Sequence, residues 1–332
     1  MNKRLRFIQR KITRILALLF LLPMLLACDS FIYDDTTECY SGFHIRFKYD
    51  YNMKFADAFP KEVDRVNLFV FDEQGRFITF KTESGDALKD KNYSMTLDVQ
   101  PGTYHLVAWP GLDDTSYSFT KSLESIETIS DLQVMLNQAE NKTSNQDLRS
   151  LWHGEIKDAK VGNQYEDITI SLVKDTRRIR LVLQQMDGVP ITENDFRFEI
   201  TDDNSLMNYD NSVIPNGTTT YLPYVSGHGT IGDIDIISHV YTELHVGRLM
   251  ANSGARLRVI SNSENKVIVD IPLIDYLLLT ELEGHKDSMT TQEYLDRQDE
   301  YSLVFFLGKD LSWLKIQIIV NGWTVRFNNQ GL

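Results

Sequence analysis

Short segments in which apolar and polar side chains alternate follow one another along most of the chain. In residues 43–48, three large apolar residues alternate with a histidine and two basic residues. This period of two is typical of a strand that has one face in a core and the other in water. Further strands are expected at residues 65–72, 76–81, 93–99, 102–109, 151–156, 167–173, 179–185, 195–200, 256–261 and 266–273. Short strands in close succession favour antiparallel β-sandwiches over an alternating βαβ fold.

Two short sequences are expected to be turns between strands. The Gln-Pro-Gly sequence of residues 100–102 combines a proline, whose φ is already fixed, with a glycine that is free to take a positive φ. Near the C-terminus, Asn321 and Gly322 separate the alternating segments 314–320 and 323–327. Asn-Gly is the strongest two-residue signal for a type I′ hairpin turn, because both positions need a positive φ. The sequence therefore predicts a hairpin there.

Little of the chain is expected to be helical. Residues 292–298 are expected to form a helix, since Thr290 and Glu293 have the spacing of a capping box, which satisfies the first free amides. Residues 120–147 are polar but carry an apolar residue at every third position from 123 to 135. That spacing fits either a short helix or a long loop packed on a sheet. The predicted fold is therefore all-β with short helical insertions.

A basic interruption divides the strands into two groups. The sequence Lys-Asp-Thr-Arg-Arg at residues 174–178 follows one run of strands and precedes the next. A mature chain of about 300 residues is long enough for two domains of ordinary size. We therefore place a domain boundary near residue 175 and expect one β-sandwich at residues 42–175 and a second at residues 176–332.

The N-terminal residues have the composition of a secretory signal peptide. Residues 1–14 carry six basic side chains and no acidic one, and nearly every residue from 15 to 27 is apolar. As a helix, these thirteen residues would span only about 20 Å, whereas the hydrocarbon core of a bilayer is about 30 Å thick. A signal peptide at residues 1–27 is therefore a better interpretation than a permanent transmembrane helix.

The apolar run ends abruptly at a cysteine. Leu25, Leu26, Ala27 and Cys28 resemble the bacterial lipobox, Leu-x-[Ala/Gly]-Cys, in which the cysteine thiol is acylated and becomes the first residue of the mature protein. Several acyl chains, each contributing about 0.8 kcal/mol per buried methylene, would make detachment from a membrane very slow. The alternative is a free cysteine at the end of an ordinary signal peptide. On the first interpretation, residues 28–41 form a lipidated tether.

Charge and cysteine content argue against several classes of function. Loss of residues 1–27 would remove six basic residues and no acidic one, which takes the formal charge from −13 to −19. So negative a chain is not expected to bind nucleic acid, because neutralising phosphates requires Lys and Arg. With Cys28 acylated, Cys39 is the only other cysteine, so the sequence has neither a disulfide framework nor a Cys-x-x-Cys zinc site.

The sequence contains no familiar catalytic or cofactor-binding motif. It lacks His-Glu-x-x-His, Gly-x-Ser-x-Gly, Walker, dinucleotide-binding and EF-hand sequences. We therefore expect neither an enzyme nor a bound cofactor or metal. The histidines are scattered, as is usual for structural or surface residues. They are His44, His105, His153, His228, His239, His245 and His285.

One pair of residues could still form an acid–base site. His153 and Glu155 lie two residues apart and would share one face of a strand. The interpretation that we favour is simpler: a strand begins there, with Trp152 buried and Gly154 at a bulge.

Two acidic clusters could supply oxygen ligands for calcium. They are Asp113-Asp114 and Asp202-Asp203-Asn204. Neither has the spacing of a known calcium-binding loop, so we expect both to be solvated loops.

The four tryptophans suggest sugar binding, because aromatic rings stack against sugars. Trp109 and Trp323 lie within alternating segments, Trp152 near the start of a strand and Trp313 just before the last hairpin. Each position is compatible with a place in the core, which we favour over a carbohydrate platform.

Several segments together resemble one protein family. The chain is similar to the fimbrillin-A-associated anchor proteins, the lipoprotein subunits at the base of type V pili in Bacteroides-type bacteria. The resemblance lies in residues 28–78, 97–109, 151–155, 292–307 and 318–327, which extend in order through nearly the whole mature chain.

The resemblance implies two tandem transthyretin-like β-sandwiches, in agreement with the strands expected from the residues themselves. It also implies a surface-exposed protein that holds a fimbrium in the outer membrane and terminates its growth. Subunits of this class join by strand complementation, in which a strand of one subunit fills a groove in the next. The expected partners are therefore fimbrial (pilin) subunits and, through acyl chains on Cys28, the outer membrane. The alternative function is a surface lipoprotein that binds glycans through its β-sandwiches.

The same resemblance makes the first strand informative, because polymerising subunits of this class lose an N-terminal strand to a trypsin-like cut. Between Cys28 and Phe43 the chain has no Lys or Arg, and the first basic residues, Arg46 and Lys48, lie inside the first expected strand. We therefore expect this chain to keep that strand.

Overall fold

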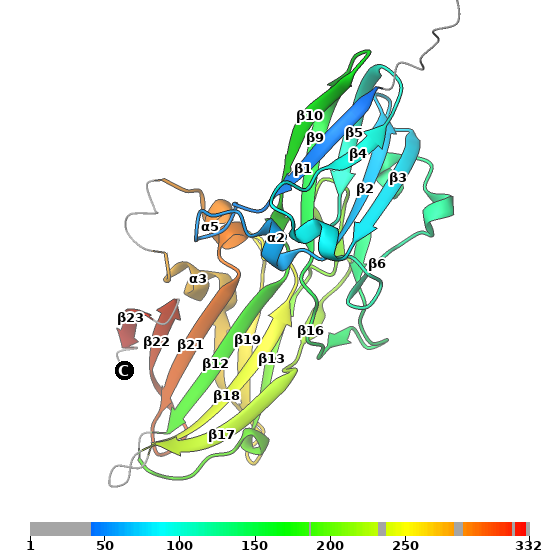
Figure 1. Cartoon of the computed structure of the whole chain (residues 1–332). Helices are drawn as coiled ribbons and strands as arrows, with labels where there is room; N and C mark the ends of the chain where they lie inside the picture. Colours follow the sequence, from blue (N-terminus) through cyan, green and yellow to red (C-terminus); the bar gives the residue numbers. More distant parts are fainter. Residues whose placement is uncertain (1–40, 186, 232–236, 282–287, 321–322, 330–332) are drawn as a thin grey trace, which may run out of the picture.

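The computed structural model describes residues 41–185, 187–231, 237–281, 288–320 and 323–329, which fold into two β-sandwiches placed end to end (Figure 1). The helices of the described residues are short. They are α2 (Phe59–Glu62), α3 (Leu273–Leu278) and α5 (Thr291–Arg297), with 3₁₀ turns η1 (Asp86–Lys89), η2 (Leu123–Ser125), η3 (Ile129–Asp131) and η4 (Glu193–Asp195). The prediction of an all-β fold of two tandem transthyretin-like sandwiches with short helical insertions is confirmed.

The first sandwich packs a three-stranded sheet on a five-stranded sheet. The first has the order β10 (Tyr165–Ser171), β1 (Gly42–Lys48), β4 (Met95–Asp98), and the second has the order β11 (Val173–Lys174), β9 (Trp152–Val161), β5 (Gly102–Ala108), β2 (Arg65–Asp72), β3 (Phe77–Ser84). Alternate residues of β1 and β2, such as Ile45 and Leu68, point into the core between the two sheets.

The second sandwich packs a six-stranded sheet on a five-stranded sheet. The first has the order β17 (Val225–Ile231), β18 (Ile237–Val246), β12 (Arg177–Gln185), β21 (Glu300–Leu307), β22 (Trp313–Val320), β23 (Trp323–Asn329), and the second has the order β20 (Lys266–Pro272), β19 (Arg256–Ser261), β13 (Phe196–Asp202), β16 (Thr219–Tyr221), β8 (Thr143–Ser144). The two halves share one feature of topology. The strand that opens each half, β1 or β12, lies parallel to a later strand of that half, β10 or β21.

A small sheet connects the two sandwiches. It has the order β15 (Val213–Ile214), β14 (Leu206–Met207), β7 (Val134–Leu136), β6 (Tyr117–Phe119). Strand β7 pairs with β14, and β8 pairs with β16, so residues that precede position 175 complete sheets formed by residues that follow it. The larger hydrophobic core accordingly continues from the second sandwich to Phe69 and Trp109 on the outer face of the first. The chain passes from β11 to β12 at residues 175–176, and a domain boundary near 175 stays a prediction.

Several local expectations need correction. Residues 120–147 form no α-helix. They contain two 3₁₀ turns and the short strands β7 and β8 joined by loops, and they pack Leu132 against the core, which is nearer to the second of the two alternatives. The Gln-Pro-Gly turn is a corner between two different sheets, so β4 and β5 do not form a hairpin. The alternation patterns also missed β17, β18 and β21. The reason in β21 is that residues 303–307 are consecutive apolar residues, so the sequence of this strand does not alternate.

The predicted helix near residue 292 is confirmed as α5. Thr290 caps it, because its side chain accepts a hydrogen bond of 3.1 Å from the amide of Glu293. The carboxylate of Glu293 turns instead to Arg297, one turn further along, at 2.8 Å.

Candidate functional site

Strand β1 is the central strand of the three-stranded sheet. It pairs in parallel with β10 along its whole length, from Gly42 opposite Tyr165 to Lys48 opposite Ser171. On its other side, residues 42–45 pair antiparallel with β4. Both edges of the N-terminal part of the strand are therefore bonded, and a protease could reach this backbone only by opening the sheet.

The side chains of β1 also fix it in place. Phe43 and Ile45 have no exposed surface, and Phe47 is 5% exposed. Burying a side chain of this size contributes about 1.5–3 kcal/mol. Gly42 allows a close approach of the chains, because a Cβ atom there would lie 2.0 Å from the carbonyl oxygen of Leu97. The first strand thus fills its groove as an integral part of the first sandwich.

The segment that follows β1 is tied to the second half of the chain. The amide of Met53 donates a hydrogen bond of 3.2 Å to the carbonyl of Arg297 in α5. The guanidinium of Arg297 in turn lies 3.9 Å from the centre of the Tyr51 ring, a cation–π contact. These two contacts connect the segment after β1 directly to α5.

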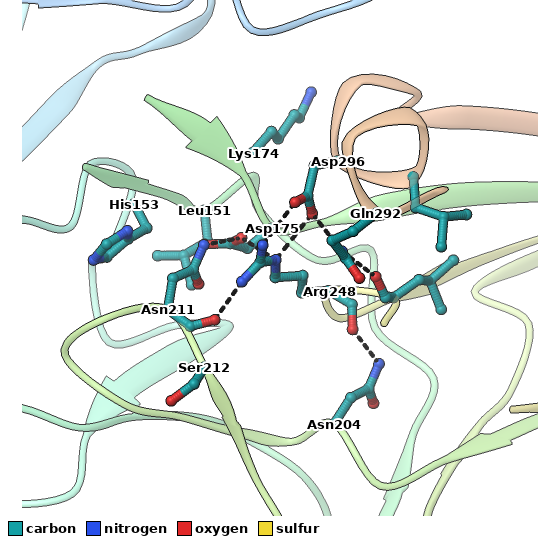
Figure 2. A network of polar contacts seen from close by, with 12 residues as sticks. Leu151, His153, Lys174, Asp175, Asn204, Asn211, Ser212, Arg248, Gln292 and Asp296 are labelled. Carbon is teal, nitrogen blue, oxygen red and sulfur yellow. Dashed lines mark hydrogen bonds and ion pairs between the residues drawn. The ribbon is translucent and has the colours of Figure 1, made fainter. Parts of the chain in front are cut away.

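Charged residues from distant segments meet at the junction between the sandwiches (Figure 2). Arg248, which follows β18, donates to both carboxylate oxygens of Asp296 in α5, at 2.9 and 2.7 Å. A third hydrogen bond of Arg248 goes to the carbonyl of Asn211, whose side-chain amide donates to Asp175 at 3.0 Å. The group connects the end of the first half with two loops and a helix of the second.

The junction is almost closed to water. Asp175 is fully buried, and this burial raises the pKa of its carboxyl above the usual range even though Arg248 lies 3.8 Å away. Arg177 is also fully buried and donates to the carbonyls of Leu295, at 3.0 Å, and Asp296, at 3.2 Å. Buried charges tolerate removal of a partner poorly, so this network favours one relative orientation of the two sandwiches.

An ion pair at the edge of the junction adds to this connection. Lys174 lies 3.2 Å from Glu62 of the first half and 3.0 Å from Asp299 of the second. Together these contacts join β1, α5 and the junction. This arrangement offers no nucleophile beside a base, and in the described residues no group of three or more His, Cys, Asp or Glu could hold a metal ion.

The proposed acid–base pair is not formed. Glu155 pairs with His105, at 2.6 Å, while the Nε2 atom of His153 lies 2.8 Å from the carbonyl oxygen of Tyr209. Burial lowers the pKa of His153 to about 4, so it is neutral at physiological pH. The strand start with a buried Trp152 is confirmed.

The expected bulge lies elsewhere in β9. The register with β5 shifts between Tyr104 and Leu106, opposite residues 157–158, where Asp158 has a φ of 56°. Gly154 has a different role: a Cβ atom there would lie 2.5 Å from Ile170 in the facing sheet. The glycine therefore permits close packing of the two sheets.

The two acidic clusters differ from each other. Asp113 lies in a turn, where it accepts from Thr115 and pairs with Arg149 at 3.1 Å, as expected for a surface loop. The expectation of a solvated loop is wrong for Asp202 and Asn204, which are buried where β13 ends.

Several of the histidines and tryptophans contact neighbouring rings or lie in the core. His44 stacks on Tyr165, and His245 stacks on Tyr224. Trp109 and Trp152 are buried, so neither can present a platform to a sugar. Trp313 packs against Phe305 in the core.

Several predicted features lie outside the described residues. They are the Asn321-Gly322 turn, His285, and the N-terminal features, namely the signal peptide at residues 1–27 and the tether at residues 28–41 as far as residue 40, with the lipidation site Cys28. The strands that this turn joins, β22 and β23, are antiparallel neighbours as predicted, and the turn type stays a prediction. Among the described residues, no helix is long and apolar enough to cross a membrane.

The junction was not anticipated from the sequence. The sequence indicates only a basic interruption at residues 174–178, although Arg177 and Asp175 in this segment are fully buried. Arg248 lies between apolar segments, and a charged residue in such surroundings is a signal for a buried ion pair. The sequence does not show that its partner is Asp296, 48 residues away.

Comparisons with known proteins bear on these features. A sequence profile of the family described as fimbrillin-A associated anchor proteins Mfa1 and Mfa2 matches residues 36–329. The chain is 26% identical over 229 residues to the minor fimbrium anchoring subunit Mfa2 of Porphyromonas gingivalis, a match that covers 67% of this chain and 69% of that protein.

Two crystal structures from Bacteroides thetaiotaomicron have a similar fold. One, described as a candidate adhesin, is 39% identical with a TM-score of 0.79, and the match covers 89% of this chain and 100% of that one. The other, described as a candidate polysaccharide-binding protein, is 32% identical with a TM-score of 0.73, and the match covers 87% and 99%.

Proposed function

Because the chain belongs to the family of fimbrillin-A associated anchor proteins, we propose that it is the basal subunit that attaches a type V fimbrium to the outer membrane. Family membership makes it a fimbrial anchor protein and not a member of an enzyme family. Beyond family membership, we propose how the protein is attached to a lipid, which membrane it is attached to, and how growth of the fimbrium stops.

Lipid attachment is proposed at Cys28. The support is the lipobox-like sequence that ends there and the start of the first strand at Gly42. Acylated Cys28 would begin the mature chain, and residues 28–41 would form a tether between the membrane and the first sandwich. Several acyl chains would hold the protein at the cell surface almost irreversibly.

Termination of growth is proposed to follow from retention of β1. The observation that carries this proposal is that β1 is paired with β10 and β4 and buries Phe43 and Ile45 completely. A groove that already holds its own strand cannot accept a strand from another subunit. The anchor would then join the fimbrium by strand complementation at one end only, which makes it the last subunit.

Substitution of the acylated cysteine tests the anchoring role. A strain that produces Cys28→Ala should release its fimbrial subunits from the outer-membrane fraction into the culture medium, because the fimbrium loses its tether. Cys39→Ala is the matched control and should leave the fimbriae attached. Fimbriae that stay in the membrane fraction with Cys28→Ala would contradict anchoring through this residue.

Glycan binding is a second candidate function. It is supported by the likeness to the structure described as a candidate polysaccharide-binding protein. A protein at the base of a fimbrium could carry such a site on a sandwich face that is not used for assembly. Any such site must use residues other than the buried Trp109 and Trp152.

A further inference from the structure

The six-stranded sheet of the second sandwich has a hollow on the face turned away from the core. The hollow has a volume of about 540 Å³ and lies over β18, β12 and β21. These three strands are hydrogen-bonded neighbours in the lower half of Figure 1. The odd-numbered residues of β12, such as Leu181, point into the core, so the even-numbered residues form the floor of the hollow.

One end of the floor is apolar and aromatic. The register places Tyr241 of β18 beside Val182 of β12, and Val182 beside Val304 of β21. Tyr241 is half-buried, and its ring is the largest side chain of this row. The guanidinium of Arg180 lies over one side of the Tyr241 ring, 5.9 Å from its centre. The row therefore presents an apolar strip whose aromatic end borders directly on the first of the charged groups.

The other end of the floor carries matched charges. Arg180 pairs with Glu243 at 3.1 Å, and Arg178 pairs with Glu300 at 2.7 Å. Two guanidinium groups and two carboxylates give this end no formal net charge, while each pair presents donors next to acceptors. A ligand with a net charge would gain little here, whereas a neutral ligand with adjacent hydroxyl groups could bind both members of a pair.

Two glycines of the edge strand β17 leave one side of the hollow without projecting side chains. Gly227 and Gly229 of β17 lie beside Tyr241 and His239. A Cβ atom at Gly227 would lie 2.6 Å from the Tyr241 hydroxyl, and one at Gly229 would lie 2.9 Å from the His239 ring. The absence of side chains therefore lets both rings lie over the edge strand, and no side chain of these two residues rises beside the hollow.

A second hollow continues the first toward the junction. It has a volume of about 170 Å³ and shares Arg178 and Glu300 with the larger one. Its other residues include Lys174 and Thr176, which precede β12. The combined groove follows the direction of β12 and is long enough to hold more than one unit of a linear ligand.

We propose that this groove binds a neutral oligosaccharide. A pyranose ring has an apolar face of C–H groups, which suits the strip at Tyr241, and hydroxyl groups at its rim, which suit the paired charges at Arg180 and Arg178. The proposal rests on the second candidate function and specifies its site. Tyr241 is the platform and the two arginines with their carboxylate partners are the hydroxyl-binding groups.

Native affinity electrophoresis of the purified mature protein tests this site. The probes are three neutral polysaccharides, yeast mannan, arabinoxylan and amylopectin, with polygalacturonate as an anionic comparison. Retardation by at least one neutral polysaccharide is expected, and it should persist in 0.5 M sodium chloride. Tyr241→Ala and Arg180→Ala should each weaken the apparent affinity at least tenfold. Tyr165→Ala, which removes a ring from the first sandwich, is the matched control and should bind like the wild type.

Each outcome decides one point. If the midpoint temperatures of thermal unfolding of the variants stay within a few degrees of that of the wild type, their loss of affinity is a local effect. If all variants bind a neutral polysaccharide as the wild type does, the protein binds glycans but the groove is not the site. If none of the three is bound by the wild type, both this proposal and the second candidate function are wrong. Retardation by polygalacturonate alone, lost in high salt, would contradict a neutral ligand.

Discussion

Arg248 holds Asp296 through two hydrogen bonds of 2.9 and 2.7 Å at the junction of the two sandwiches. The pair joins the segment after β18 to helix α5, and α5 also contacts the segment that follows β1. Through this pair, β1, which lies nearest the proposed tether, is connected to the second sandwich by a continuous set of contacts. A protein that transmits load from a fimbrium to a membrane requires such continuity.

Loss of the Asp296 carboxylate should destabilise the protein strongly. Asp296→Ala leaves the fully buried Arg177 without its carboxylate partner and leaves Arg248 only Asp175, at 3.8 Å. Removing one partner of a buried ion pair costs about 3–5 kcal/mol. We expect a decrease of that size in the free energy of unfolding, measured by urea denaturation followed by tryptophan fluorescence.

An exposed ion pair of similar length provides the control. Arg256 and Asp270 lie 2.7 Å apart, and their side chains are 47% and 42% exposed. Asp270→Ala should cost less than about 1 kcal/mol, because water already screens the pair. Equal effects of the two substitutions would show that the junction contributes no more than a surface contact.

A buried carboxyl should make stability depend on pH. Asp202 is 5% exposed, and burial raises its pKa to about 6. In the unfolded chain an Asp carboxyl has a pKa near 3.9, so the native state binds the Asp202 proton more tightly than the unfolded state does. The protein therefore loses stability as the pH rises from about 4 to above 6. Asp202→Asn should remove this loss and gain about 2 kcal/mol relative to the wild type between pH 4.5 and 7.5.

The comparison requires thermal or urea unfolding at several pH values. Asp275→Asn, at an exposed position of α3, is the control and should give a curve parallel to that of the wild type. If the free energy of unfolding of Asp202→Asn also changed with pH in parallel with that of the wild type, the Asp202 carboxyl would not titrate in this range in the native state.

The inward side chains of β1 should carry much of the stability of the first sandwich. Ile45→Ala removes a side chain with no exposed surface and should cost about 2–5 kcal/mol. Arg46→Ala, at the next position, whose side chain points to solvent, should change the free energy of unfolding by less than about 0.5 kcal/mol. Urea denaturation of the two variants checks this, and a cost below 1 kcal/mol for Ile45→Ala would mean that β1 is dispensable.

The sequence predicted the parts of the fold in which local pattern and environment agree. Strands β1 and β19 have the predicted positions because each has a pattern that its two different faces explain. The pattern failed at β21, where several apolar residues are consecutive, and at Gly154, where a glycine is needed because the facing sheet packs closely against it. The junction depends on Arg248 meeting Asp296, and the groove depends on Tyr241 meeting Val182. Both are long-range consequences of strand order that no local spacing encodes.

The central claim is that this chain is an anchor that keeps its first strand. Mass spectrometry of the protein isolated from assembled fimbriae tests it most directly. Lys54 and Lys61 are exposed, and Arg65 begins β2, so a trypsin-like protease has possible sites after β1. The account predicts a mature form that starts at acylated Cys28 and contains Phe43 to Lys48. A dominant form that starts after Lys54, Lys61 or Arg65 would contradict it and would identify a polymerising subunit.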